Sequence, residues 1–143
     1  MPLYRLAYAS LVNKKLTKTD LREILSKSVN NNGRDNIGGA LLFNSGMFLQ
    51  VLEGSRAALN VTYRRILLDD RHERAELIGL EPVMKRLFKS WSMALIEDNA
   101  AAKRTLMKYC GADKPVVDNL SLTEACEMML EMLGQPKPER SAS

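Results

Sequence analysis

Gln50 is a polar residue at the centre of an apolar stretch, where its amide needs partners. Residues 47–54 read MFLQVLEG, an apolar run of strand length that ends at Gly54. Such a run predicts a strand that is covered on both faces. A buried amide without partners costs about 1–3 kcal/mol, yet the same group can accept from one neighbour while it donates to another. Gln50 therefore either caps a buried backbone group or belongs to a hydrogen-bonding site.

Further polar residues share faces of two predicted helices and two predicted strands. The helical residues recur at i, i+3, i+4 or i+7, which places each set on one face. The first helical set is Ser28, Asn31 and Asn32, and the second is Arg65, Asp69 and His72. Strand alternation places three further residues on one face of their predicted strands: Tyr8, Trp91 and Met93. If the two helices lie side by side, their polar faces line one groove whose floor is the middle of the sheet. Such a groove suits a flat polar heterocycle with a charged tail.

Each of these features also has a purely structural interpretation. Arg65 and Asp69 have the i, i+4 spacing of a surface ion pair. The asparagines of residues 30–32 are typical of a helix C-terminus and turn, and His72 lies in a charged stretch where solvation is common. Trp91 and Met93 have the composition of a core strand. No single residue identifies a function.

Composition excludes several classes of protein. The net charge is +4 (21 minus 17), and the basic residues are spread along the chain, so nucleic-acid binding is not expected. No apolar run approaches the roughly 18 residues of a membrane span, and the N-terminus lacks the apolar core of a signal peptide. The two cysteines have no metal or disulfide spacing, which favours a cytoplasmic location, and with a single histidine no metal site is expected.

The periodicity of the chain predicts an α+β fold. Strands are expected near residues 3–9, 37–43, 47–53, 76–83 and 88–96. Helices are expected from Thr17, which begins a capping-box-like TKTD, to the Asn-Gly run at residues 30–33, and from Ser55 to about residue 67. The order βαββαββ favours a ferredoxin-like sheet with both helices on one face.

The C-terminal third reads as helical. Residues 100–110 predict one helix, and the capping box at residues 121–124 opens a second one that continues to residue 133. We expect these helices, in an extension over residues 98–134, to cover the other face of the sheet, and a disordered tail at residues 135–143. Met128 and Met132 fall off the predicted apolar stripe of the second helix, which predicts an exposed docking surface there.

Several motifs together resemble a known family. LYRLAYAS, the asparagine pair before IGGALL, FLQVLEG, the DDRH turn and SWSM occur in the order and spacing of the BLUF domain, a blue-light sensor that uses FAD. The resemblance covers residues 2–97 and implies a sensor domain at residues 1–97. It implies that Tyr8 and Gln50 form the photoactive pair, with Trp91 and Met93 linked to signalling.

The resemblance also implies which residues hold the flavin. These residues lie on the two helices, on the central strand and in the DxRH turn: Ser28, Asn31, Asn32, Gln50, Arg65, Asp69, Arg71 and His72. Gly38 and Asn36 depart from the family pattern, which has threonine and glycine there. Both are expected at the start of a strand, so we expect them to affect local packing and kinetics more than flavin binding.

The function implied is that of a photoreceptor and not of an enzyme. Light is expected to rearrange the hydrogen bonds of Tyr8, Gln50 and the flavin, and the change is expected to bias a two-state element. We expect a homo-oligomer, at least a dimer, that signals to a separate partner protein through the C-terminal helices. Two alternatives share the fold: an acylphosphatase-type hydrolase, for which no Gly-rich anion loop follows the first strand, and an RNA-binding module, for which no basic-aromatic signature is found.

Overall fold

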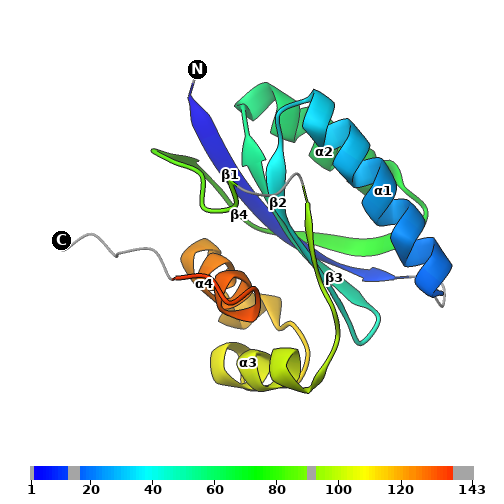
Figure 1. The fold of residues 1–143 in the computed structure, drawn as a ribbon, viewed down its shortest axis with the longest axis vertical. Helices are drawn as coiled ribbons and strands as arrows, with labels where there is room; N and C mark the ends of the chain where they lie inside the picture. The colour runs from blue at the N-terminus through cyan, green and yellow to red at the C-terminus, as the bar shows by residue number, and fades with distance from the viewer. Residues whose placement is uncertain (1, 13–16, 90–92, 137–143) are drawn as a thin grey trace.

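The protein consists of one sheet with a pair of helices on each face. The computed structural model describes residues 2–12, 17–89 and 93–136 (Figure 1). The elements in chain order are β1 (Leu3–Val12), α1 (Lys18–Arg34), β2 (Gly38–Asn44), β3 (Met47–Gly54), α2 (Arg56–Leu68), β4 (His72–Val83), β5 (Ala94–Ile96), α3 (Ala100–Cys110), a 3₁₀ turn (Val117–Asn119) and α4 (Leu122–Met132). α1 and α2 lie on one side of the sheet, and α3 and α4 lie on the other (Figure 1).

The sheet has the ferredoxin-like order that the sequence predicts. Its strands are arranged β4-β1-β3-β2-β5. β1 pairs antiparallel with both β3 and β4, β2 pairs antiparallel with β3, and β5 pairs parallel with β2 at the edge. Tyr8 lies opposite Gln50 in the β1–β3 register. The prediction of a βαββαββ sheet with two helices on one face is confirmed.

Alternation along the central strands gives the sheet two different apolar faces. Leu6, Tyr8 and Phe48 belong to the core under α1 and α2. Ala7 and Leu49, each one residue further along its strand, belong to the core under α3 and α4. Successive side chains of a strand point to opposite faces. The residues that form the floor of the groove are therefore separated from the C-terminal helices by the thickness of the sheet.

α1 begins as predicted but continues further. Thr17 caps its N-terminus through a capping box with Asp20. The helix runs through the Asn-Gly segment of residues 30–33, where its end was expected, and terminates at Asp35, whose backbone N–H bonds to the carbonyl of Asn31. Asn36 then turns the chain with a positive φ of 56°. Packing of the last helical turn thus overrides the weak helix propensity of asparagine.

α4 is buried on more than one side, which corrects the expectation of a methionine docking surface. Met128 is fully buried, and Met132 packs partly buried against the core under α3 and α4. Leu122 lies against Gly79 of β4, where a Cβ would approach to 3.1 Å. The helix contacts both the sheet and α3. A single apolar stripe was therefore the wrong description of this helix.

The last two strands differ from their predicted bounds. β4 is longer and starts at His72, whereas β5 consists of residues 94–96 and not of the expected 88–96. Phe88 is nevertheless fully buried, in the segment between the strands. Trp91 and most of the expected tail at residues 135–143 lie outside the described residues. No helix in the described part of the chain is long and apolar enough to cross a membrane.

Candidate functional site

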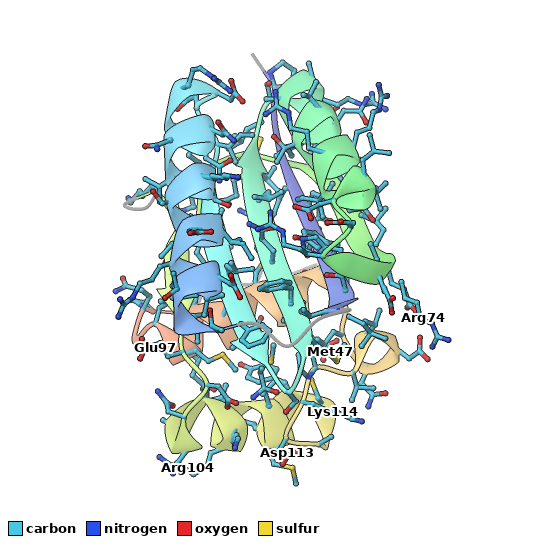
Figure 2. All side chains as sticks on the ribbon, turned by 90° about the vertical axis from the view of Figure 1, so that its right-hand side faces the viewer. Met47, Arg74, Glu97, Arg104, Asp113 and Lys114 are labelled. Atoms are coloured by element: carbon cyan, nitrogen blue, oxygen red, sulfur yellow. The ribbon has the colours of Figure 1, made fainter. Side chains whose placement is uncertain are left out.

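A cavity of about 260 Å³ lies between α1 and α2, over the middle of the sheet. Figure 2 shows the two helices side by side with the central strands behind them. Nine of the residues singled out in the sequence line the cavity: Tyr8, Ser28, Asn31, Asn32, Gln50, Arg65, Asp69, Arg71 and His72. The predicted groove is thus formed, and residues up to 64 positions apart in the chain meet in it.

Gln50 has a partner at each end of its amide. Its Oε1 accepts a hydrogen bond from the hydroxyl of Tyr8 at 2.5 Å, and its Nε2 donates to the sulfur of Met93 at 3.4 Å. All three side chains are buried, and Gln50 is 5% exposed. These contacts join β1, β3 and the residue that directly precedes β5 across one face of the sheet. Among the described residues, the buried amide is therefore held by side chains and caps no backbone group.

Tyr8 is held in its neutral, proton-donating form. Burial raises the pKa of its phenol well above the usual value, and Tyr63 and Asp69 raise it further. The Tyr63 ring lies at 5.5 Å between centroids. An anionic tyrosine could not donate to Gln50, so this environment maintains the direction of the Tyr8–Gln50 hydrogen bond.

His72 is part of the cavity wall and not a solvated loop residue. Its Nδ1 lies 2.7 Å from the hydroxyl of Ser10, and its ring packs against Phe48 at 5.2 Å between centroids. Burial lowers the pKa of His72, although Asp69 partly opposes this effect. The ring is therefore biased towards its neutral form near pH 7. Ser10 could not be recognised as its partner from the sequence, because β1 and β4 meet only in the folded sheet.

The charged residues at the cavity are paired differently from the expectation. Asp69 accepts from Arg71 at 2.6 Å, and this bond lowers the pKa of Asp69 to about 2. Arg65 lies 3.9 Å from Asp35, at the end of α1. The i, i+4 pair of Arg65 with Asp69 is thus wrong, because the α2 helix ends at Leu68 and Asp69 has left the helical path. Arg65 instead bridges the two helices.

The two asparagine side chains of α1 that line the cavity differ in how deeply they are buried. Asn32 is buried, and its backbone carbonyl accepts from the N–H of Ile37 at 2.8 Å, which ties the helix to the start of β2. Asn31 is half-buried, and its side-chain oxygen lies 3.5 Å from the guanidinium of Arg34. Both are inside the helix, so they are not the C-cap of the alternative interpretation.

Six residues of the cavity were not predicted from the sequence: Ile24, Lys27, Leu41, Phe48, Thr62 and Ile66. The apolar ones were assigned to the core, and they form the floor and sides. Lys27 could have been found, because it precedes Ser28 and lies four residues before Asn31 on α1. Thr62 likewise lies three residues before Arg65. In both cases the helical spacing was the available signal.

The lining combines three kinds of surface. Apolar side chains form a floor, amide and hydroxyl groups offer both donors and acceptors, and Lys27, Arg65 and Arg71 bring positive charge. Such a lining is complementary to a flat heterocycle with carbonyl and N–H groups on its edge and an anionic group beyond it. Among the described residues, no group of three or more His, Cys, Asp or Glu side chains could hold a metal ion.

One family of known proteins matches most of this chain, including the strands and helices that form the cavity. The profile of the family described as "BLUF: Sensors of blue-light using FAD" matches residues 3–94. The photoactivated adenylate cyclase subunit beta of Euglena gracilis is 32% identical over 92 residues, which is 64% of this chain and 11% of that protein. This chain therefore corresponds to a small part of the length of that relative.

Two solved structures have the same arrangement. BlrB, a BLUF protein in its dark state, is 32% identical with a TM-score of 0.67, over 77% of this chain and 80% of BlrB. BlsA in its photo-activated state has a TM-score of 0.82 over 96% of this chain and 99% of BlsA, and at 24% identity this likeness speaks for the fold. With its profile match, its βαββαββ sheet and the Tyr8–Gln50 contact, this chain belongs to the BLUF family of blue-light photoreceptors that use FAD.

Proposed function

We propose that the cavity between α1 and α2 is the place where this photoreceptor holds its FAD, and that Gln50 is the residue that light reorients. The observation that carries the proposal is the buried chain of contacts Tyr8–Gln50–Met93, in which Tyr8 and Gln50 line the cavity and Met93 lies behind them. Because the sulfur of Met93 is only a weak acceptor, the Nε2 end of the amide gives up little when Gln50 turns over.

The residues present fit a flavin. The amides of Asn31, Asn32 and Gln50 supply donors and acceptors for the polar edge of an isoalloxazine ring, and the apolar floor suits its flat faces. We assign Lys27, together with Arg65, Arg71 and the hydroxyl of Ser28, to the anionic part of FAD, because cationic groups favour phosphate. His72 and Asp69 complete this wall, with Asp69 orienting Arg71.

The chain's own residues then supply the switch. Flavin excited by blue light is a strong oxidant. Loss of an electron from Tyr8 makes its phenol a far stronger acid, and the proton moves along the existing bond to Oε1 of Gln50. When the electron and proton return, the amide can be left rotated or tautomerised, with its acceptor and donor ends exchanged. Met93 then loses the donor it has in this structure. Nothing is consumed in this cycle, and we propose that this chain itself turns over no substrate.

A light-minus-dark absorption spectrum tests the proposal. We expect the purified protein to be yellow, to release FAD on heating, and to show a small red shift of the flavin band that decays in the dark. Tyr8→Phe removes the proton donor and Gln50→Ala removes the amide, so each is expected to keep the flavin and lose the shift. Tyr63→Phe, beside Tyr8 but outside the Gln50 contact, is the matched control and should keep the shift. A colourless protein, or a wild-type photocycle in Tyr8→Phe, would contradict the proposal.

We further propose that residues 1–97 act as the sensor, with residues 98–134 as a helical extension, in a cytoplasmic homo-oligomer that signals to a separate protein. Two buried free cysteines, Cys110 and Cys126, are consistent with a reducing compartment. The exposed apolar side chains that could support association lie at the end of α2 and on β4: Leu67, Leu68, Leu77 and Leu80. Light scattering in the dark and under blue light would test this, and a monomer in both conditions would argue against the oligomer.

A further inference from the structure

The connection from β4 to β5 crosses the whole sheet. β4 lies at one edge and β5 at the other, with β1, β3 and β2 between them. The chain therefore leaves the sheet at the edge formed by β4 and enters it again at the opposite edge, beyond three intervening strands. The structure describes this crossover up to Lys89 and again from Met93. Met93 is the residue that directly precedes β5.

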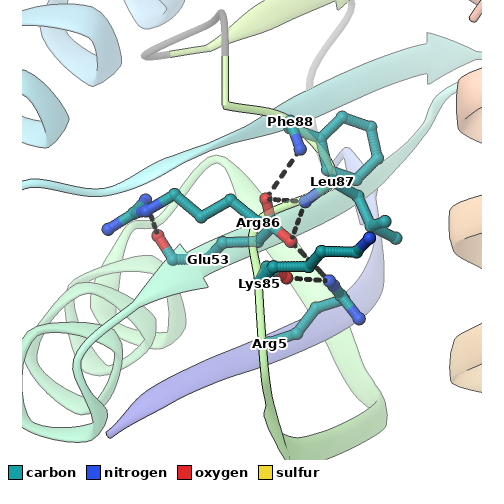
Figure 3. A network of polar contacts seen from close by, with 6 residues as sticks. All are labelled: Arg5, Glu53, Lys85, Arg86, Leu87 and Phe88. Carbon is teal, nitrogen blue, oxygen red and sulfur yellow. Dashed lines mark hydrogen bonds and ion pairs between the residues drawn. The ribbon is translucent and has the colours of Figure 1, made fainter. Parts of the chain in front are cut away.

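Glu53 of β3 anchors the middle of the crossover. Its side chain is 0% exposed, and its two carboxylate oxygens accept backbone N–H groups from Leu87, at 2.9 and 3.1 Å, and from Phe88, at 2.8 Å (Figure 3). Arg5 of β1 completes the set with an ion pair at 2.8 Å. A carboxylate so fully satisfied holds the backbone of the loop in one position.

Two arginines attach the crossover to the neighbouring strands. Arg5 also donates to the carbonyl of Lys85 at 3.0 Å, which fixes the loop over β1. Arg86 donates to the backbone carbonyl of Glu53 at 3.1 Å and to that of Asn36 at 2.7 Å, which fixes the loop over β3 and at the turn two residues before β2. Figure 3 shows the Arg5 guanidinium beside the Glu53 carboxylate and the Arg86 guanidinium at the backbone carbonyl of Glu53. The loop is thus attached at each strand that it passes.

This network lies next to the switch but on the opposite face of the sheet. Gln50 and Glu53 are three residues apart on β3, so one faces α1 and α2 and the other faces α3 and α4. β5 pairs with β2 at only three positions, residues 94–96. Buried ion pairs add little to stability but can specify a geometry.

We propose that Arg5, Glu53 and Arg86 are positioning residues for the photoreaction, because they hold the crossover so that the sulfur of Met93 lies at the amide of Gln50. The inference rests on the proposed function of Gln50. It assigns a role in the photocycle to three residues that do not line the cavity and that touch neither Tyr8 nor Gln50. Their effect on the photocycle should pass through Met93.

The rate of dark recovery after blue light tests this inference. Met93→Ala sets the reference for a switch without its sulfur partner. We expect Glu53→Gln and Arg86→Ala each to shift the recovery rate in the same direction as Met93→Ala. The shift should be about threefold or more, the size expected of residues whose effects are coupled. Arg86→Ala leaves no buried charge unpaired, so it decides the question if Glu53→Gln does not fold. Lys108→Ala is the control, since it breaks an ion pair of 2.7 Å between α3 and α4 that does not touch the crossover.

Double variants separate positioning from general loosening. In the Met93→Ala background, Arg86→Ala should change the recovery rate by less than about 1.5-fold, because the contact through which it acts is already absent. An undiminished effect in that background would overturn the inference, and so would single variants that recover like Lys108→Ala. Absence of a red shift in the wild type would instead refute the proposed function, whatever the variants do.

Discussion

His72 illustrates how one residue joins the cavity to the sheet. It is the first residue of β4, and its Nδ1 is engaged by Ser10 of β1, two residues after Tyr8. Its ring lies 6.3 Å from that of Tyr8 between centroids. A charged imidazolium at this position would have to lose much of its hydration. The site therefore favours the neutral ring, which is also the form that leaves the charge balance of Asp69 and Arg71 undisturbed.

We expect the free energy of unfolding to fall as the pH is lowered from about 7.5 to 5.5, because burial lowers the pKa of His72 in the folded state. The unfolded chain binds the proton near pH 6.5, and the folded chain binds it only at lower pH. The contribution of His72 to the free energy of unfolding is therefore fully present above the unfolded pKa and is lost as the pH falls below it. Urea unfolding at the two pH values measures the effect. His72 is the only histidine of the chain, so His72→Gln should remove most of the pH dependence. An equal dependence in both proteins would contradict this assignment.

At the scale of the elements, the β2–β3 pair has a position that admits only glycine. Gly39 has a φ of 156°, and a Cβ there would lie 1.9 Å from the backbone carbonyl oxygen of Val51. Backbone atoms in the centre of a sheet cannot move aside as a flexible side chain can. Leu41, which lines the cavity, is two residues further along the same strand. The glycine therefore permits the close pairing of β2 with β3 from which the floor is built.

Gly39→Ala should destabilise the protein by about 3 kcal/mol or more, because it combines backbone strain with a clash inside the sheet. Gly46→Ala is the matched control: that glycine also has a positive φ, 76°, but no atom lies within 4 Å of its Cβ position. There we expect a loss of about 1 kcal/mol from strain alone. Urea midpoints of the two variants provide the comparison. Equal losses would show that the contact with Val51 is unimportant.

At the scale of the molecule, the sheet separates a sensing face from a packing face. The cavity opens on the side of α1 and α2. The other side is covered by α4, a helix in which most residues are buried. The crossover from β4 to β5 connects the two sides, since Phe88 packs with the α3–α4 core while Met93 packs with the α1–α2 core. The two cores of the molecule are thus joined by Phe88 and Met93, five residues apart in the chain.

Truncation after Asn99 should expose the packing face and change the assembly state. The side chains left without cover are apolar and fully buried in the whole chain, Leu42, Leu49 and Val51 among them. We expect strong binding of a hydrophobic dye and larger species by light scattering. The fraction that stays soluble should still show the light-induced red shift, since α1, α2 and the cavity lie on the other face. A truncated protein with no dye binding and an unchanged assembly state would contradict this prediction.

The sequence alone determined the order of the elements, the three N-caps at Thr17, Ser55 and Ser121, and the helix faces that meet at the cavity. These features are local: hydrophobic periodicity and capping act within a few residues, so they are visible without the fold. Gln50 could be recognised because a polar residue in an apolar strand is a local anomaly.

The tertiary structure alone decided which partner each polar group meets. Ser10 meets His72, 62 residues away, and Arg5 meets Glu53, 48 residues away. It also decided that Met128 is buried, since α3 and the sheet cover two sides of α4 and one helix cannot show how many neighbours it has. Partner choice depends on strand order and register, which are properties of the assembled sheet and not of any single segment.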